Sequence, residues 1–202
     1  MKNIVLFLTF FLVYNNFIFS QNSDNNIFEM IEFNKTKHKK IYQIDLIDSP
    51  QSVELIELKN GKCFGNIILK LSSSEYGIYI DKISINEDTV KLLMIKSQQI
   101  GIETITNCYK NKDCINYLDG SDVFFRIQTN EIDRKYSFSE LYPNQISEIN
   151  IPKNRKQSQE IINILYNYLD FKKSYEEMRI KLPPGRYSYF ENNRIGIIDI
   201  KE

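Results

Sequence analysis

The chain has 202 residues, with 26 basic and 26 acidic side chains and a formal net charge of zero. This balance excludes the basic surface that binding to nucleic acid or to an anionic membrane requires. One histidine, three cysteines and seven glycines are present, which leaves little material for a zinc site or a glycine-rich phosphate loop. A catalytic triad would depend on His38, which lies among basic residues. We therefore expect no metal, no cofactor and no nucleic-acid partner.

Residues 1–20 have the pattern of a secretory signal peptide. Lys2 precedes an apolar stretch over 4–13, and Ser20 is a small residue at the expected cleavage point. The stretch is about ten residues long, half of what a membrane-spanning helix needs. We expect a periplasmic or secreted protein with no membrane span after cleavage. An uncleaved anchor, with residues 17–19 extending the stretch, is the alternative.

The first half of the remaining chain has the pattern of an antiparallel meander. Alternating apolar and polar residues over 40–47 predict a half-buried strand, and residues 76–85 repeat that pattern. Residues 53–71 place two apolar runs around Asn60-Gly61, a strong hairpin signal because both central residues of a type I′ turn need a positive φ. Before these strands, the asparagine-rich residues 21–26 are predicted to be a disordered leader.

The second half adds helices and hairpins. Asn86 is suited to the N-cap of a helix that ends at Gly101, and residues 155–173 have apolar side chains at spacings of three and four. The capping-box pattern over 174–177 predicts a short further helix, and a terminal hairpin is expected around residues 192–193. Residues 27–202 are therefore predicted to form a single α+β domain, an antiparallel β-sheet of meander and hairpins packed against two main α-helices.

Two of the three cysteines lie in one polar loop. In an exported protein, Cys108 and Cys114 are expected to form a disulfide bond, whereas Cys63, in an apolar stretch, is expected to be a buried free thiol. Acidic residues near this loop, Asp113, Asp119 and Asp122, could bind a hard cation, but a turn around Asp119-Gly120 explains them more simply.

Aromatic residues flank the cysteine loop and form the predicted binding site, which consists of Tyr109, Tyr117 and Phe124. Strand alternation places Phe124 and Phe125 on opposite faces of the sheet, so one of them belongs to the core and the other is free to meet a helix or a partner. An aromatic side chain beside a rigid loop is a common recognition device. Core filling is the alternative.

Several of these segments together resemble a family of exported Bacteroidota proteins with no assigned function. The likeness rests on the succession Leu118-Asp119-Gly120, Tyr136-Ser137-Phe138, an apolar helix near residue 160, and Leu182-Pro183-Pro184-Gly185 with Tyr187. It covers roughly residues 53–198. The resemblance implies export and a single domain, but no activity.

The function that follows is a non-catalytic binding domain for a protein or cell-envelope partner, with an inhibitor or immunity protein as a narrower version. No residue is assigned a catalytic role. The alternative is a cell-envelope hydrolase that uses paired carboxylates, which predicts two acidic side chains about 5 to 10 Å apart, one with a raised pKa. The sequence makes no prediction of the oligomeric state.

Overall fold

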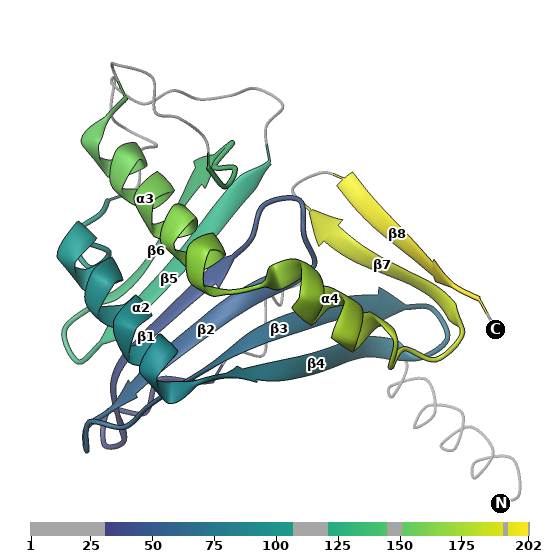
Figure 1. Ribbon diagram of the computed structural model, residues 1–202, viewed down its shortest axis with the longest axis horizontal. Helices are drawn as coiled ribbons and strands as arrows, with labels where there is room; N and C mark the ends of the chain where they lie inside the picture. The colour runs from purple at the N-terminus through teal and green to yellow at the C-terminus, as the bar shows by residue number, and fades with distance from the viewer. Residues whose placement is uncertain (1–30, 107–120, 145–150, 192–193, 202) are drawn as a thin grey trace, which may run out of the picture. The chain divides into compact units, whose positions relative to one another are not determined.

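The computed structural model describes residues 31–106, 121–144, 151–191 and 194–201 (Figure 1). The chain divides into Met1–Ile31 and Glu32–Glu202, and every helix and strand described below belongs to the second unit. No helix in the described ranges is long and apolar enough to cross a membrane.

Several predictions concern residues outside the described ranges. They are the signal peptide (1–20), the leader (21–26), the disulfide between Cys108 and Cys114, and the aromatic residues Tyr109 and Tyr117. These stay predictions, whereas Phe124 and Cys63 are placed by the structure.

The described strands form an antiparallel eight-stranded sheet. A meander of four strands comes first, followed by two hairpins, and the bounds are β1 (His38–Asp45), β2 (Gln51–Leu58), β3 (Cys63–Ser73), β4 (Gly77–Ile85), β5 (Asp122–Thr129), β6 (Asp133–Ser139), β7 (Gly185–Glu191) and β8 (Arg194–Ile200). The spatial order is β6-β5-β1-β2-β3-β7-β8, with β4 on the other side of β3. The long strand β3 makes this possible, because β2 pairs with residues 63–69 and β7 pairs with residues 72–73.

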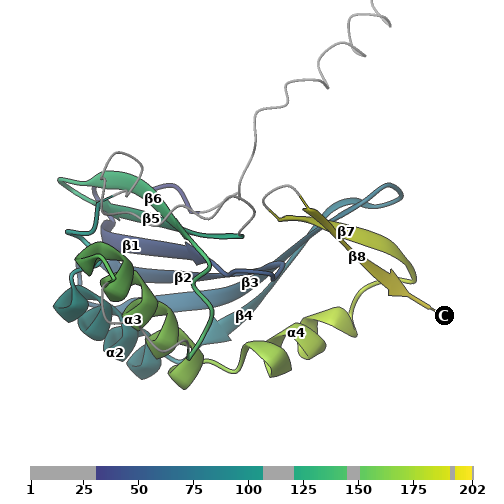
Figure 2. The same cartoon turned by 90° about the horizontal axis from the view of Figure 1, so that it is seen from above.

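Three described helices lie on one side of the sheet (Figure 2). They are α2 (Glu87–Ile100), α3 (Lys153–Tyr168) and α4 (Phe171–Arg179). The antiparallel sheet and the α+β class are confirmed. The helical layer differs from the predicted pair, because α3 packs against α2 while α4 contacts β3 and β4.

The boundaries of α2 follow the prediction, and those of α4 do not. Asn86 Oδ1 accepts a hydrogen bond from the backbone N–H of Asp88 at 2.9 Å, and Gly101 ends α2 with a φ of 102°. The predicted helix over 155–173 is divided, because Leu169 is extended and Asp170 caps a new helix by accepting from Lys173 N–H at 2.9 Å. The predicted start at Ser174 is therefore wrong, since this residue lies inside α4.

The main core lies between the sheet and the helices. Alternate side chains of β1, including Tyr42 and Ile44, belong to one apolar cluster with Val90, Leu93 and Met94 of α2. Cys63 belongs to this cluster as a buried free thiol, as the sequence predicts. On each strand, the residues that alternate with these core residues point to the opposite face of the sheet, which no described helix covers.

Gly65 sets how closely β3 approaches its neighbours. A Cβ atom there would lie 2.6 Å from the carbonyl oxygen of Glu54 and 3.1 Å from Cγ2 of Val90. We expect Gly65→Ala to lower the free energy of unfolding by about 1–3 kcal/mol, because the sheet and α2 must move apart. Chemical denaturation measures this, with the exposed Ser84→Ala on β4 as the control. Equal midpoints for the two variants would contradict the packing described here.

Candidate functional site

Phe124 is the one predicted binding residue that the structure describes. It is half-buried on β5, directly opposite Asp45 of β1 and Ser137 of β6. Phe125 points to the helix side, where it is 1% exposed and stacks on Tyr136 with ring centroids 4.9 Å apart. The predicted alternation is therefore confirmed, and it places Phe124 on the face that no described helix covers, here called the helix-free face.

A row of polar side chains crosses this helix-free face. Gln43 of β1 pairs with Glu54 of β2, which pairs with Asn66 of β3. The amide groups of Gln43 and Asn66 each donate to a carboxylate oxygen of Glu54 at 3.4 Å. Arg126 of β5 lies opposite Gln43 on its other side. Glu54 is fully buried, so these amide donors help to offset the cost of placing its carboxyl group away from water.

Several buried polar atoms on the helix-free face have no hydrogen-bond partner. Of the seven such side-chain atoms in the described ranges, five belong to one contiguous group on β5, β1 and β2: Gln43 Oε1, Asp45 Oδ1, Ser52 Oγ, Arg126 Nε and Gln128 Oε1. We call these five residues the polar patch. Buried polar groups in native proteins nearly always have partners. The concentration of exceptions in the polar patch therefore marks it as a place where further hydrogen bonds can form.

Among the described carboxyl groups with a clear pKa shift, Asp45 is the one whose pKa is raised. Burial raises its pKa to about 8, although the positive charge of Lys70 acts in the opposite direction. Asp45 pairs with Ser52, and Gln43 pairs with Glu54, so the carboxyl groups of Asp45 and Glu54 stand at diagonal positions on neighbouring strands. Such positions are about 7–8 Å apart between Cα atoms. The structure therefore places an acidic side chain with a raised pKa at a diagonal position to a second acidic side chain.

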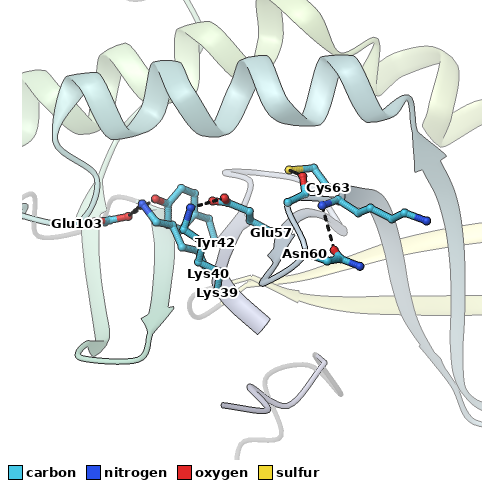
Figure 3. A network of polar contacts seen from close by, with 9 residues as sticks. Lys39, Lys40, Tyr42, Glu57, Asn60, Cys63 and Glu103 are labelled. Atoms are coloured by element: carbon cyan, nitrogen blue, oxygen red, sulfur yellow. Dashed lines mark hydrogen bonds and ion pairs between the residues drawn. The ribbon is translucent and has the colours of Figure 1, made fainter. Parts of the chain in front are cut away.

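A second polar network lies on the helix side of the sheet (Figure 3). Lys40 Nζ is 2.6 Å from Glu103 Oε1, and the Tyr42 hydroxyl donates to the same oxygen. Nearby, Lys39 Nζ is 2.6 Å from Glu57 Oε1. Burial raises the pKa of Glu103, but the hydrogen bonds from Lys40 and Tyr42 outweigh it, so the net pKa is lowered. Burial and the bond to Glu103 raise the pKa of Tyr42.

This network holds the turn after α2 against the sheet. Arg134 of β6 donates to the carbonyl oxygens of Glu103 and Ile105 at 3.2 and 2.9 Å, and the Tyr136 hydroxyl donates to that of Ile102 at 3.2 Å. The polar side chains of this network satisfy one another's hydrogen bonds, which is typical of a structural role. We therefore assign it a role in folding.

The lone histidine and the described cysteine have structural surroundings too. His38 Nδ1 accepts from the backbone N–H of Asn34 at 3.0 Å, and its ring lies 5.9 Å from that of Phe33. Burial raises the pKa of the Cys63 thiol, which lowers its reactivity. Of the acids considered for a cation, Asp122 accepts a hydrogen bond from the Ser139 hydroxyl. No cluster of three or more potential metal ligands occurs in the described ranges.

The polar patch is absent from the sequence prediction. The sequence does show Gln43 and Asp45 at alternate positions of a strand, but that pattern also suits a solvent-facing side. Recognising the patch requires knowing that β5 pairs with β1, and the paired residues of these two strands lie about 80–90 positions apart in the chain. No family model, curated protein or solved structure matches this chain.

The raised pKa of Asp45 predicts that the stability of the protein depends on pH. A folded-state pKa near 8 lies above the value of about 3.9 in the unfolded chain, so the protein loses stability as the pH rises from about 4 to 8. We expect Asp45→Asn to remove this loss, so the stability of the variant relative to the wild type should increase by several kcal/mol between about pH 4 and pH 8. Denaturant unfolding at several pH values measures the difference.

Glu103→Gln is the matched control, because it should change the free energy of unfolding in the opposite direction. Because the pKa of Glu103 is lowered, its stabilisation is present above about pH 4.5 and is lost as the pH falls. This variant should therefore be less stable than the wild type at neutral pH, and the difference should shrink in acid. Parallel pH profiles for Asp45→Asn and the wild type would refute the burial of an ionisable Asp45.

Proposed function

We propose that this protein is an exported, non-catalytic binding domain, and that its ligand binds the helix-free face at the polar patch. The observation that carries this proposal is the contiguous group of five buried polar atoms without partners. A ligand that supplied these hydrogen bonds would recover the cost of burying them. Within the patch the side chains of Asp45 and Arg126 are half-buried, and half-buried Phe124 borders the patch, so these three provide the contact that a ligand meets first.

The chemistry of the polar patch favours a ligand with neutral polar groups. The free atoms of Gln43 and Gln128 accept hydrogen bonds, and that of Arg126 donates. The hydroxyl of Ser52 and the carboxyl group of Asp45, which is protonated below about pH 8, do both. Hydroxyl and amide groups, which also donate and accept, complement this mixture. We therefore favour a neutral glycan of the cell envelope over a charged ligand.

The remaining parts of the proposal rest on the sequence. The apolar stretch over 4–13 supports export to the periplasm or beyond, and with it a Cys108–Cys114 disulfide. Tyr109 and Tyr117 precede β5 in the chain and stay candidate contacts beside Phe124. An inhibitor or immunity protein remains the narrower version if the partner is a protein.

Binding to purified peptidoglycan sacculi tests this function. We expect the wild-type protein to sediment with the sacculi, and Arg126→Ala to bind at least tenfold more weakly, since it removes about one hydrogen bond from a charged donor, worth about 1.5–3 kcal/mol. Tyr109→Ala, Tyr117→Ala and Phe124→Ala are measured in the same assay. Lys82→Ala, an exposed change on β4 of the same face, is the control. A folded wild-type protein that binds neither sacculi nor solubilised envelope proteins would contradict the proposal.

The second candidate is a cell-envelope hydrolase, which the diagonal placement of Asp45 and Glu54 and the pKa of about 8 favour. Asp45 would donate the proton as a general acid, and Glu54 would act as the base or nucleophile. A hydrolase releases soluble fragments from sacculi near neutral pH, and Asp45→Asn and Glu54→Gln should each lower that rate at least a hundredfold. Lys82→Ala again serves as control. Binding without any release by the wild type would exclude this candidate.

A further inference from the structure

The sheet has three edge strands in its described part, and they differ in how they are protected. Edge strands commonly carry charged residues that prevent pairing with another chain. The middle of β4 carries Asp81 and Lys82, and β6 carries charged residues at 133–135. The middle of β8, Ile195–Ile198, carries no charge. Its outer edge, which has no partner among the described strands, is therefore open to pairing.

One face of β8 is also strongly apolar. Ile195 and Ile197 are 64% and 59% exposed, although they lie in a regular strand. The other face is occupied, because Tyr189 pairs with Gly196 so closely that a Cβ atom there would lie 2.1 Å from the tyrosine ring. One face of the hairpin is therefore covered by the Tyr189 ring, whereas the other face is apolar and exposes Ile195 and Ile197.

The residues of β8 are complementary to themselves. Antiparallel pairing of two copies about Gly196 sets Ile195 of each copy opposite Ile197 of the other, which joins four isoleucines into one cluster. Pairing about Ile197 would instead set Ile195 opposite Asp199. In the first arrangement Asp199 stays at the margin and keeps its ion pair with Arg186, whose Nε lies 2.8 Å from Oδ1.

We propose that this protein forms a two-fold symmetric dimer through β8, in the register centred on Gly196. The pairing would satisfy the outer backbone groups of both strands and bury the exposed isoleucines together. A pair of seven-residue strands gives an interface below the usual size, so we expect a dissociation constant of about 10–100 μM. This dimer is independent of ligand binding at the polar patch.

Sedimentation equilibrium of the purified native protein tests the dimer. We expect the wild type to dimerise with a dissociation constant of about 10–100 μM, and Ile197→Lys to raise that constant at least tenfold. Ile95→Lys is the matched control, since Ile95 is 54% exposed on α2, away from β8. A wild type that stays monomeric to about 1 mM, or an Ile197→Lys variant that associates as strongly as the wild type, would overturn the proposal.

A mixing experiment tests the register. Ile197→Lys and Ile195→Glu should each dimerise poorly alone, whereas a mixture should form a heterodimer, because the new lysine of one copy then faces the new glutamate of the other. Both positions are mostly exposed, and circular dichroism checks that each variant is folded. A mixture no more associated than its components would refute the register centred on Gly196.

Discussion

The two-residue period of β1, held between β2 and β5, is the constraint on which the rest of the structure depends. Tyr42 and Ile44 point toward the helices and enter the main core, while Gln43 and Asp45 point to the helix-free face. A shift of register by one residue would exchange these two sets. The same alternation that buries the core therefore also assembles the polar patch.

The polar side chains on the two sides of this strand differ in whether their hydrogen bonds are complete. On the helix side, Lys40, Tyr42 and Glu103 satisfy one another and fasten the turn after α2 to the sheet (Figure 3). On the helix-free face, Asp45 retains a free oxygen and a raised pKa. A complete network contributes stability, whereas an incomplete one lowers stability unless a ligand completes it. This contrast distinguishes the polar patch from the network around Glu103.

Sequence signals that act over a few residues, such as helix caps and strand alternation, predicted the corresponding elements correctly. Asn86 and Gly101 bound α2 because a side-chain acceptor and a left-handed residue suit the two ends of a helix. Phe124 and Phe125 separate onto two faces because every strand alternates. The division between α3 and α4 was missed, since the apolar spacing continues through Leu169 and Phe171, which are both buried although the backbone between them is not helical.

By itself the sequence determined the antiparallel meander, the α+β class and the alternation of β1 and β5 between two faces, because these follow from periodicity and turn chemistry over a few residues. Only the tertiary structure decided that β5 adds beside β1 and that β7 takes the place of β2 along the end of β3. Those pairings join residues far apart in the chain. Asp45, Arg126 and their neighbours become one patch through them, and β8 becomes an edge, because backbone hydrogen bonding selects strand partners without leaving a local mark on the sequence.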